Sequence, residues 1–177
     1  MRYLVVVAMA VVAMGCNTAP INGAEPVQGF ELDRYLGTWY EIARLDHPFE
    51  RGLSNVTAEY ARETETTVSV VNRGFKTGSG EWDRIQGTAR FRGDPGTGSL
   101  EVSFFGPFYA GYHIVALDAE APDYGYALVV SSSPRFMWIL ARGPELDEAV
   151  YARLVAQARG LGIDTDGLIR VEHDLGE

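Results

Sequence analysis

The chain has 177 residues and a formal net charge of −9 at pH 7, with 15 basic and 24 acidic side chains and a single cysteine. This length suits one domain that buries about two thirds of its unfolded surface. A surface so poor in cations is unsuited to tracking phosphates, which argues against a nucleic-acid partner. Apolar residues make up 46% of the chain, and its 20 glycines are spread along it, as in a soluble all-β domain.

The first 16 residues have the pattern of an exported lipoprotein. Arg2 supplies a positive start, and residues 3–14 form an apolar run that is too short to be a stable membrane anchor. Gly15 then precedes Cys16, as in bacterial signals whose cysteine is diacylated and becomes the new N-terminus. We therefore predict that residues 1–15 are a signal peptide and that Cys16 is the lipidation site. An ordinary secretory peptide cleaved nearby is the alternative.

The residues after the signal indicate a tether and a location. Residues 16–28 are rich in Pro, Gly, Asn and Ala, which predicts a flexible tether ahead of one domain over residues 29–177. Position 17 is Asn rather than Asp. By resemblance to enterobacterial sorting, this favours the outer membrane, facing the periplasm. An acylated Cys16 would leave no thiol for a disulfide, a metal site or a catalytic nucleophile.

Eight segments with the composition and spacing of short antiparallel strands follow the tether. In residues 54–62 the apolar Val56, Ala58 and Tyr60 alternate with polar residues, which is the period of a half-buried strand. An Asp-Pro-Gly turn signal separates two later segments at residues 94–96. The predicted strands cover residues 37–46, 54–62, 67–75, 82–92, 100–105, 112–118, 126–132 and 135–142.

These strands predict an all-β fold, an eight-stranded antiparallel up-and-down barrel. Closure of the barrel removes exposed strand edges, and eight strands leave room for one small ligand. The periodicity then changes, because residues 145–159 place Leu146, Val150 and Leu154 four residues apart after Pro144. This spacing predicts a C-terminal amphipathic α-helix on the barrel wall. Residues 168–172 predict a short final strand.

Two short segments about a hundred residues apart carry a family resemblance. Gly37 and Trp39 open the first predicted strand as Gly-x-Trp, and Arg142 ends the eighth. Glycine suits a crowded corner where a Cβ would clash, and an arginine can stack on the tryptophan face. This structural signature of Gly37, Trp39 and Arg142 resembles that of the lipocalin family. A core tryptophan and an unrelated surface arginine are the alternative reading.

The resemblance covers about residues 30–172 and is closest to the bacterial outer-membrane lipocalins. Its most specific pieces are residues 35–44, 49–53, 102–109 and 138–142. It implies a lipocalin fold, no catalysis, no cofactor, and binding of fatty acids or lysophospholipids for membrane maintenance under stress. The second family signature, between strands six and seven, is degraded here, which leaves the register of that turn open.

Strand parity predicts which side chains face the barrel interior, because neighbours on a strand point to opposite sides. If Trp39 and Arg142 meet inside the base, Glu41 also faces inward, where a structural hydrogen bond is favoured over a contact with a lipid head group. Small inner residues on some strands and aromatic ones on others predict a hollow core. A fully packed barrel is the alternative. The predicted ligand-binding residues are Ala43, Val56, Ala58, Tyr60, Phe104, Tyr112, Phe136, Trp138 and Leu140.

Two other functional classes stay open on the sequence. A barrel enzyme would need a nucleophile, a metal site or an acid–base pair. His47, His113 and His173 share no metal-ligand spacing, and Glu41 is the one plausible inward carboxylate. A purely structural envelope lipoprotein is the third possibility. The sequence also leaves open the chain length and head group of a lipid ligand, and whether the protein is a monomer or a homodimer.

Overall fold

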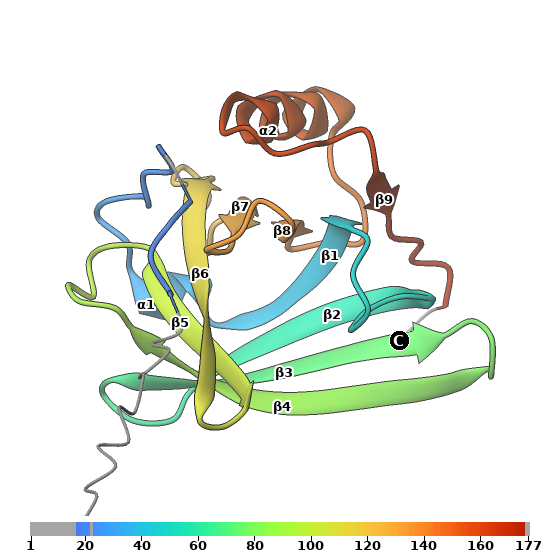
Figure 1. Ribbon diagram of the computed structural model, residues 1–177, viewed down its shortest axis with the longest axis horizontal. Helices are drawn as coiled ribbons and strands as arrows, with labels where there is room; N and C mark the ends of the chain where they lie inside the picture. The colour runs from blue at the N-terminus through green and yellow to red at the C-terminus, as the bar shows by residue number, and fades with distance from the viewer. Residues whose placement is uncertain (1–16, 22, 176–177) are drawn as a thin grey trace, which may run out of the picture.

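A computed structural model of the protein describes residues 17–21 and 23–175. The predicted signal peptide, residues 1–15, and the predicted lipidation site Cys16 lie outside the described residues. The described part contains nine strands and two helices (Figure 1). The strands are β1 (Gly37–Leu45), β2 (Leu53–Arg62), β3 (Thr67–Lys76), β4 (Glu81–Phe91), β5 (Ser99–Phe105), β6 (Phe108–Leu117), β7 (Tyr126–Val130), β8 (Met137–Ala141) and β9 (Leu168–Arg170), and the helices are α1 (Leu32–Tyr35) and α2 (Glu148–Gly160).

Strands β1 to β8 form a closed antiparallel barrel, which confirms the predicted fold. From β2 to β8 each strand pairs with the next along the chain, and β1 completes the ring by pairing with both β2 and β8. The short β9 pairs with the last part of β1, from Ala43 to Leu45. The sixth strand begins at Phe108, four residues earlier than predicted, because the aromatic segment before Tyr112 continues the hairpin with β5.

The connections gather at two ends because neighbouring strands run in opposite directions. Helix α1 and the start of β1 lie at one end, which we call the base. The β1–β2 loop (46–52), the β3–β4 turn (77–80) and the β5–β6 turn (106–107) lie at the other end, which we call the mouth. In Figure 1 the β3–β4 and β5–β6 turns both point away from α1.

Two hydrophobic clusters lie on opposite sides of the sheet. The inner cluster fills the base half of the barrel and includes Trp39 and Leu140. The outer cluster packs Ile139 of β8 against Leu154 and Ala158 of α2, and α2 covers β7 and β8 in Figure 1. The predicted amphipathic helix therefore packs on the barrel wall, as expected from its spacing.

Helix α2 begins three residues later than predicted. Asp147 is its N-cap, and the Asp147 Oδ1 atom accepts hydrogen bonds from the backbone N–H groups of Ala149 and Val150, at 2.9 and 3.1 Å. A side-chain acceptor at this position satisfies N–H groups that have no partner within the helix. Pro144 and Glu145 therefore precede the helix instead of forming its first turn.

The prediction of a flexible tether is wrong for the described residues between 17 and 28. Ile21 and Ala24 are buried in the outer cluster. The backbone N–H of Val27 donates to the Ile114 carbonyl at 2.9 Å, and the Val27 carbonyl accepts from the N–H of Gly98 at 2.9 Å. A composition rich in small and polar residues suggested disorder, but two apolar side chains and these backbone bonds hold the segment on the barrel wall.

Candidate ligand-binding site

The base of the barrel is closed by the tryptophan and the arginine of the two signature segments. The Cζ atom of Arg142 lies 4.0 Å from the centroid of the Trp39 ring, and the Trp39 Nε1–H donates to the Tyr35 carbonyl at 2.8 Å. The predicted contact between the two signatures is therefore present. The Arg142 guanidinium also donates to the backbone carbonyls of Arg34, Thr38, Asp123 and Tyr124, at 2.8 to 3.3 Å.

Gly37 serves the base through its backbone conformation rather than its lack of bulk. A Cβ at this position would lie 3.5 Å from Arg142 Nη1, which is an ordinary contact. Its φ of +92° is in the region that favours glycine. The expectation of a steric clash is therefore corrected, although glycine is still required there.

Three tyrosine hydroxyl groups form a hydrogen-bonded chain inside the barrel, above the tryptophan. The Tyr112 hydroxyl lies 2.6 Å from that of Tyr35 and 2.8 Å from that of Tyr60. Burial raises the pKa of all three phenols, so each keeps its proton and can donate. Tyr35 comes from α1, outside every predicted strand, and inward parity on the strands could not point to it.

Most of the other predicted lining residues lie on the inner side of the barrel wall. Leu140 is buried in the inner cluster, and Ala58, Phe104 and Trp138 pack against it. Gly87 makes room for Phe104, because a Cβ there would lie 2.7 Å from the Phe104 ring. Whether these residues contact a ligand remains a prediction.

Val56 and Phe136 lie nearer the mouth. Val56 is buried, and its Cγ2 atom would lie 3.3 Å from a Cβ at Gly74 on β3. The Phe136 ring stacks on Trp138 at a centroid distance of 6.3 Å and lies 5.5 Å from the ring of His47. The upper interior thus holds Val56 and a group of three rings, those of His47, Phe136 and Trp138.

Ala43 is placed on the wrong face by strand parity. The pairing of β1 with β8 shifts register between Glu41 and Ala43, which is the signature of a β-bulge. Ile42 and Ala43 both belong to the outer cluster that packs under α2. After the bulge the alternation of inward and outward side chains continues with a shift of one residue. The Arg44 side chain therefore points to the inner side, beside Glu41. Ala43 is therefore corrected from a lining residue to a contact of the outer wall.

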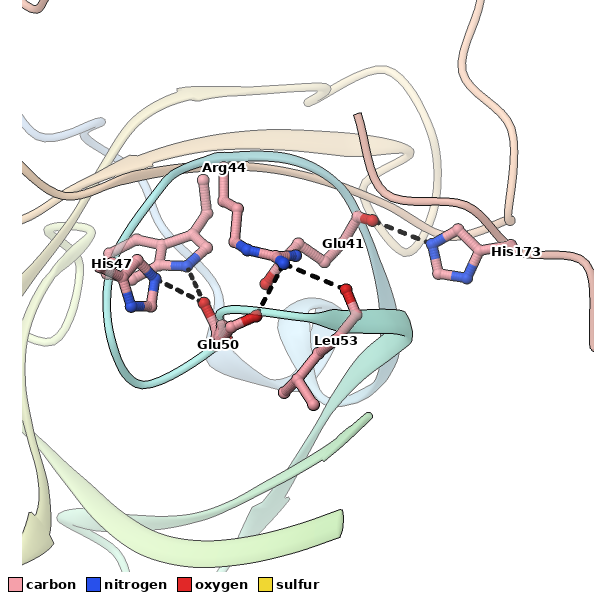
Figure 2. Close-up of polar contacts among 7 residues, drawn as sticks. Glu41, Arg44, His47, Glu50, Leu53 and His173 are labelled. Atoms are coloured by element: carbon pink, nitrogen blue, oxygen red, sulfur yellow. Dashed lines mark hydrogen bonds and ion pairs between the residues drawn. The ribbon is translucent and has the colours of Figure 1, made fainter. Parts of the chain in front are cut away.

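The bulge brings a buried arginine into the upper part of the barrel (Figure 2). Arg44 is 2% exposed. Its Nη1 donates to Glu41 Oε1 at 2.7 Å, and its Nη2 donates to the carbonyls of Glu50 and Leu53 at 2.8 and 3.1 Å. One guanidinium thus ties β1 to both ends of the segment that leads from the mouth loop into β2.

Glu50 extends this polar cluster across the mouth (Figure 2). Its Oε2 accepts from the Trp138 indole N–H at 3.0 Å and lies 2.6 Å from His47 Nε2. Burial alone would raise the pKa of Glu50, but these two donors outweigh it and hold the pKa below its usual value. Glu50 therefore carries a negative charge close to the Arg44 guanidinium.

Glu41 has the opposite electrostatic character. Burial, followed by the nearby charge of Glu50, raises its pKa well above 4.5 despite the contact with Arg44. One cation thus serves two buried carboxyl groups, and Glu41 is the one that favours its proton. The mouth cluster, defined here as Glu41, Arg44, His47, Glu50 and Trp138, was predicted only at its first and last members. Its members on β1 and the β1–β2 loop lie three residues apart. On a regular strand, side chains three residues apart point to opposite faces, so strand parity did not group them.

The C-terminal segment seals the seam between β1 and β2 on the mouth side. The Asn55 N–H donates to the Glu172 carbonyl at 2.7 Å, and its Oδ1 accepts from the Leu175 N–H at 3.0 Å. The His173 Nε2–H donates to the carbonyl of Glu41 at 2.9 Å (Figure 2). The last residues of the domain therefore support the backbone that carries the mouth cluster.

A groove of about 570 Å³ lies at the rim of the mouth, between the β1–β2 loop and the β3–β4 turn. This is a volume typical of small-molecule sites. The groove is lined by Pro48, Phe49, Arg51, Gly52, Leu53, Lys76, Thr77, Gly78, Ser79 and Asp83. Among residues 17–21 and 23–175, no group of three His, Cys, Asp or Glu side chains could hold a metal ion, and no helix is long and apolar enough to cross a membrane.

Comparisons with known proteins agree with this geometry. The family model described as "Lipocalin-like domain" matches residues 30–173. The chain is 42% identical over 172 residues to the outer membrane lipoprotein Blc of Vibrio cholerae, covering 97% of this chain and 99% of that protein. It is 43% identical over 176 residues to the protein of the same name from Escherichia coli K12, covering 97% and 98%. Insecticyanin from the tobacco hornworm Manduca sexta has a similar fold, with a TM-score of 0.69 at 21% identity over 90% of each chain.

Proposed function

Because the chain belongs to the lipocalin family, whose members bind small hydrophobic molecules, we propose that it binds fatty acids or lysophospholipids inside the barrel, as a membrane-maintenance protein of the bacterial envelope. The observation that carries this proposal is the division of the interior into an apolar wall and a polar mouth. Ala58, Phe104 and Leu140 supply apolar surface, whereas Arg44 and Glu50 gather polar groups near the opening. An amphiphile with one long chain fits this division.

The energetics favour an acyl chain over a polar metabolite. Burial of one methylene is worth about 0.8 kcal/mol, so ten methylenes give about 8 kcal/mol before the cost of ordering the ligand, which corresponds to micromolar affinity. The tyrosine chain of Tyr35, Tyr60 and Tyr112 would form the floor. The head group would then lie at the mouth, near residues 47–53 and 106–111, where water solvates it.

Binding without catalysis is part of the proposal. The two buried carboxyl groups are already engaged, Glu41 with Arg44 and Glu50 with His47 and Trp138. Neither is therefore available as a free base, and the mouth cluster is best explained as the support of the β1–β2 loop.

A pair of variants at adjacent residues on opposite faces of β2 tests the ligand site. Ala58 packs against the inner cluster, whereas Glu59 is exposed on the outer face. We expect Ala58→Trp to abolish binding of a long-chain fatty acid, measured by displacement of a fluorescent acyl probe. Glu59→Trp should bind like the unchanged protein. Circular dichroism shows whether both variants fold. Unchanged affinity in a folded Ala58→Trp protein would mean that the acyl chain does not pass this position.

Native mass spectrometry of the protein without its leader tests the ligand class directly. Copurified acyl species would identify fatty acid or lysophospholipid by mass, and the same spectrum gives the number of subunits, including a homodimer. A protein that carries no lipid and takes up neither added oleate nor added lysophosphatidylethanolamine would refute the proposal.

We also propose that Cys16 carries the lipid anchor of an outer-membrane lipoprotein. The two relatives at 42% and 43% identity bear the name outer membrane lipoprotein, and Gly15 precedes Cys16 in this chain. A single acyl chain holds a protein only marginally, whereas two or more hold it stably. Cys16→Ser should therefore release the protein to the soluble periplasmic fraction. A variant that still sediments with membranes and still incorporates labelled palmitate would contradict this assignment.

A further inference from the structure

Three large aromatic side chains are exposed at the mouth. Phe49 on the β1–β2 loop is 74% exposed, and Phe105 and Phe108 beside the β5–β6 turn are 64% and 68% exposed. Phe105 and Phe108 are paired directly across that turn, so both rings are carried by the tip of one hairpin. Exposed aromatic residues gathered at one end of a protein mark an interaction surface.

The N-terminal segment is fastened to the same hairpin. The Thr18 carbonyl accepts a hydrogen bond from His113 Nε2 at 3.0 Å, and the Thr18 hydroxyl accepts one from Arg92 Nε at 3.0 Å. A Cβ at Gly111 would lie 2.7 Å from the Thr18 carbonyl oxygen. The start of the described chain is therefore held against β6, and in Figure 1 the dark-blue ribbon runs beside β5 and β6.

This attachment limits how far the hairpin tip can lie from the anchor. Thr18 is two residues after Cys16, a span of at most about 7 Å. Gly111 is three residues from Phe108 along β6, which is about 10 Å of strand. The sum, about 17 Å, is close to half the thickness of the hydrocarbon core of a bilayer. An acylated Cys16 would hold the aromatic tip within reach of the membrane surface.

We propose that the mouth of the barrel docks on the lipid bilayer, with Phe105 and Phe108 inserted at the boundary between head groups and acyl chains. This proposal rests on the acylation of Cys16 proposed above. Phenylalanine is among the apolar side chains that interfacial protein segments bury at this boundary. A ligand could then pass between the bilayer and the barrel without crossing water. The partner is the bilayer itself, and a second copy of the chain is the alternative that the test must separate.

The charge of the protein indicates which force holds the mouth on the membrane. The chain carries a net charge of −9, so attraction to anionic lipids does not drive docking. Apolar insertion should therefore hold the mouth in place, and the contact should be nearly independent of salt, unlike a basic surface patch.

A fluorophore at the hairpin tip tests docking on the acylated full-length mature protein. Phe108→Trp places an indole at the tip, and Ile169→Trp places one on β9, where Ile169 is 36% exposed. Both proteins are reconstituted into vesicles of phosphatidylethanolamine and phosphatidylglycerol whose acyl chains are brominated. The signal of the three native tryptophans is subtracted with the unchanged protein. We expect strong quenching for Phe108→Trp, little for Ile169→Trp, and no change of either with added salt. Equal quenching of the two would overturn the proposal.

Removal of the aromatic tip provides a second measurement. The mature chain with Cys16→Ser has no acyl anchor, so its flotation with the same vesicles reports the tip alone. Full burial of a phenylalanine favours transfer by about tenfold or more. Phe105→Ser with Phe108→Ser should therefore reduce the bound fraction by about tenfold or more, whereas Ile169→Ser should not. If the double variant floats like the unchanged chain and instead converts a dimer to a monomer in sedimentation, the tip binds a second copy and the proposal is wrong.

The acyl-probe assay in vesicle-free solution separates this proposal from the function on which it rests. Probe binding that persists in the double variant, together with unquenched Phe108→Trp, would refute docking alone. Quenched Phe108→Trp in a protein that binds no acyl probe would refute lipid carriage and leave docking in place.

Discussion

The base and the mouth of the barrel both contain a partly or fully buried arginine, and they neutralise it differently. At the base Arg142 stacks on Trp39 and donates to backbone carbonyls, none of which titrates. At the mouth Arg44 donates to the carboxyl group of Glu41 and acts on that of Glu50 through its charge, and the pKa values of these two groups are displaced in opposite directions. The base is therefore a permanent closure, whereas the stability of the mouth depends on protonation.

This contrast matches what each end has to do. A ligand that enters a barrel needs one end that stays shut and one end whose loop can be ordered or released. The β1–β2 loop is held by Arg44 through the backbone carbonyls of Glu50 and Leu53, and by Trp138 through the Glu50 carboxylate. Protonation of Glu50 therefore weakens one of the contacts that hold the loop. The base has no equivalent point of weakness among the contacts described here.

The largest expected effect comes from breaking the base. Trp39 is fully buried, so Trp39→Ala removes a large apolar side chain and leaves a cavity under Arg142. We expect a loss of about 3–5 kcal/mol in the free energy of unfolding. Urea unfolding followed by circular dichroism measures it, and the loss should be the same at pH 5 and pH 8. A loss below about 1 kcal/mol would show that Trp39 does not plug the base.

Removing the arginine of the mouth cluster should lower the free energy of unfolding slightly less. Arg44→Met keeps an unbranched stem but removes the guanidinium, so Glu50 stays charged and buried without its cation. Removing one partner of a buried ion pair costs about 3–5 kcal/mol, and we expect the lower end because Glu41 already favours its proton. Urea unfolding should show this loss at pH 7 and a smaller one at pH 4.5, because the loss of the Arg44 charge raises the pKa of Glu50 and makes it easier to protonate. A loss that does not change with pH would contradict the proposed difference between the two ends.

A third group, on the outer wall, must be separated from the mouth in any acid titration. Burial lowers the pKa of His113 from 6.5 to about 4, and the hydrogen bond to the Thr18 carbonyl offsets only part of this effect. The unfolded chain takes up this proton first, so stability is lost as pH falls through 6.5 towards 4. Between pH 6.5 and 5 the loss amounts to at most about 1.6 kcal/mol.

The variant His113→Gln isolates this contribution. It should remove most of the pH dependence of unfolding between pH 6.5 and 5 while leaving the response of the mouth below that range. The comparison of unfolding midpoints across pH checks it. A pH profile identical to that of the unchanged protein would mean that His113 does not titrate with folding.

The smallest effect is expected at Glu41. Because its raised pKa favours the neutral carboxyl group, Glu41→Gln replaces it with a neutral group of the same shape that still accepts from Arg44. We expect a loss of at most about 1 kcal/mol and unchanged affinity for the fluorescent acyl probe. A tenfold weaker affinity at intact stability would instead make Glu41 a contact of the lipid head group.

The sequence alone determined the features that repeat along the chain or lie in short signatures. Alternation in β2 and the turn signals predicted the strands and the barrel, because a two-residue period reflects a sheet with two different faces. Apolar residues four positions apart predicted α2. The pairing of Trp39 with Arg142 was also foreseeable, since each lies in a distinctive segment at the end of a strand.

Tertiary structure decided what depends on a single extra residue or on segments far apart in the chain. The bulge after Glu41 is set by pairing with β8, so no pattern within β1 shows that Ala43 turns outward and Arg44 inward. The N-terminal segment looked flexible because its composition is poor in large apolar residues, yet His113 and the wall of β6 hold Thr18 in place. Local periodicity records which face of a strand is apolar. Which partners meet on that face is determined only when the strands pair.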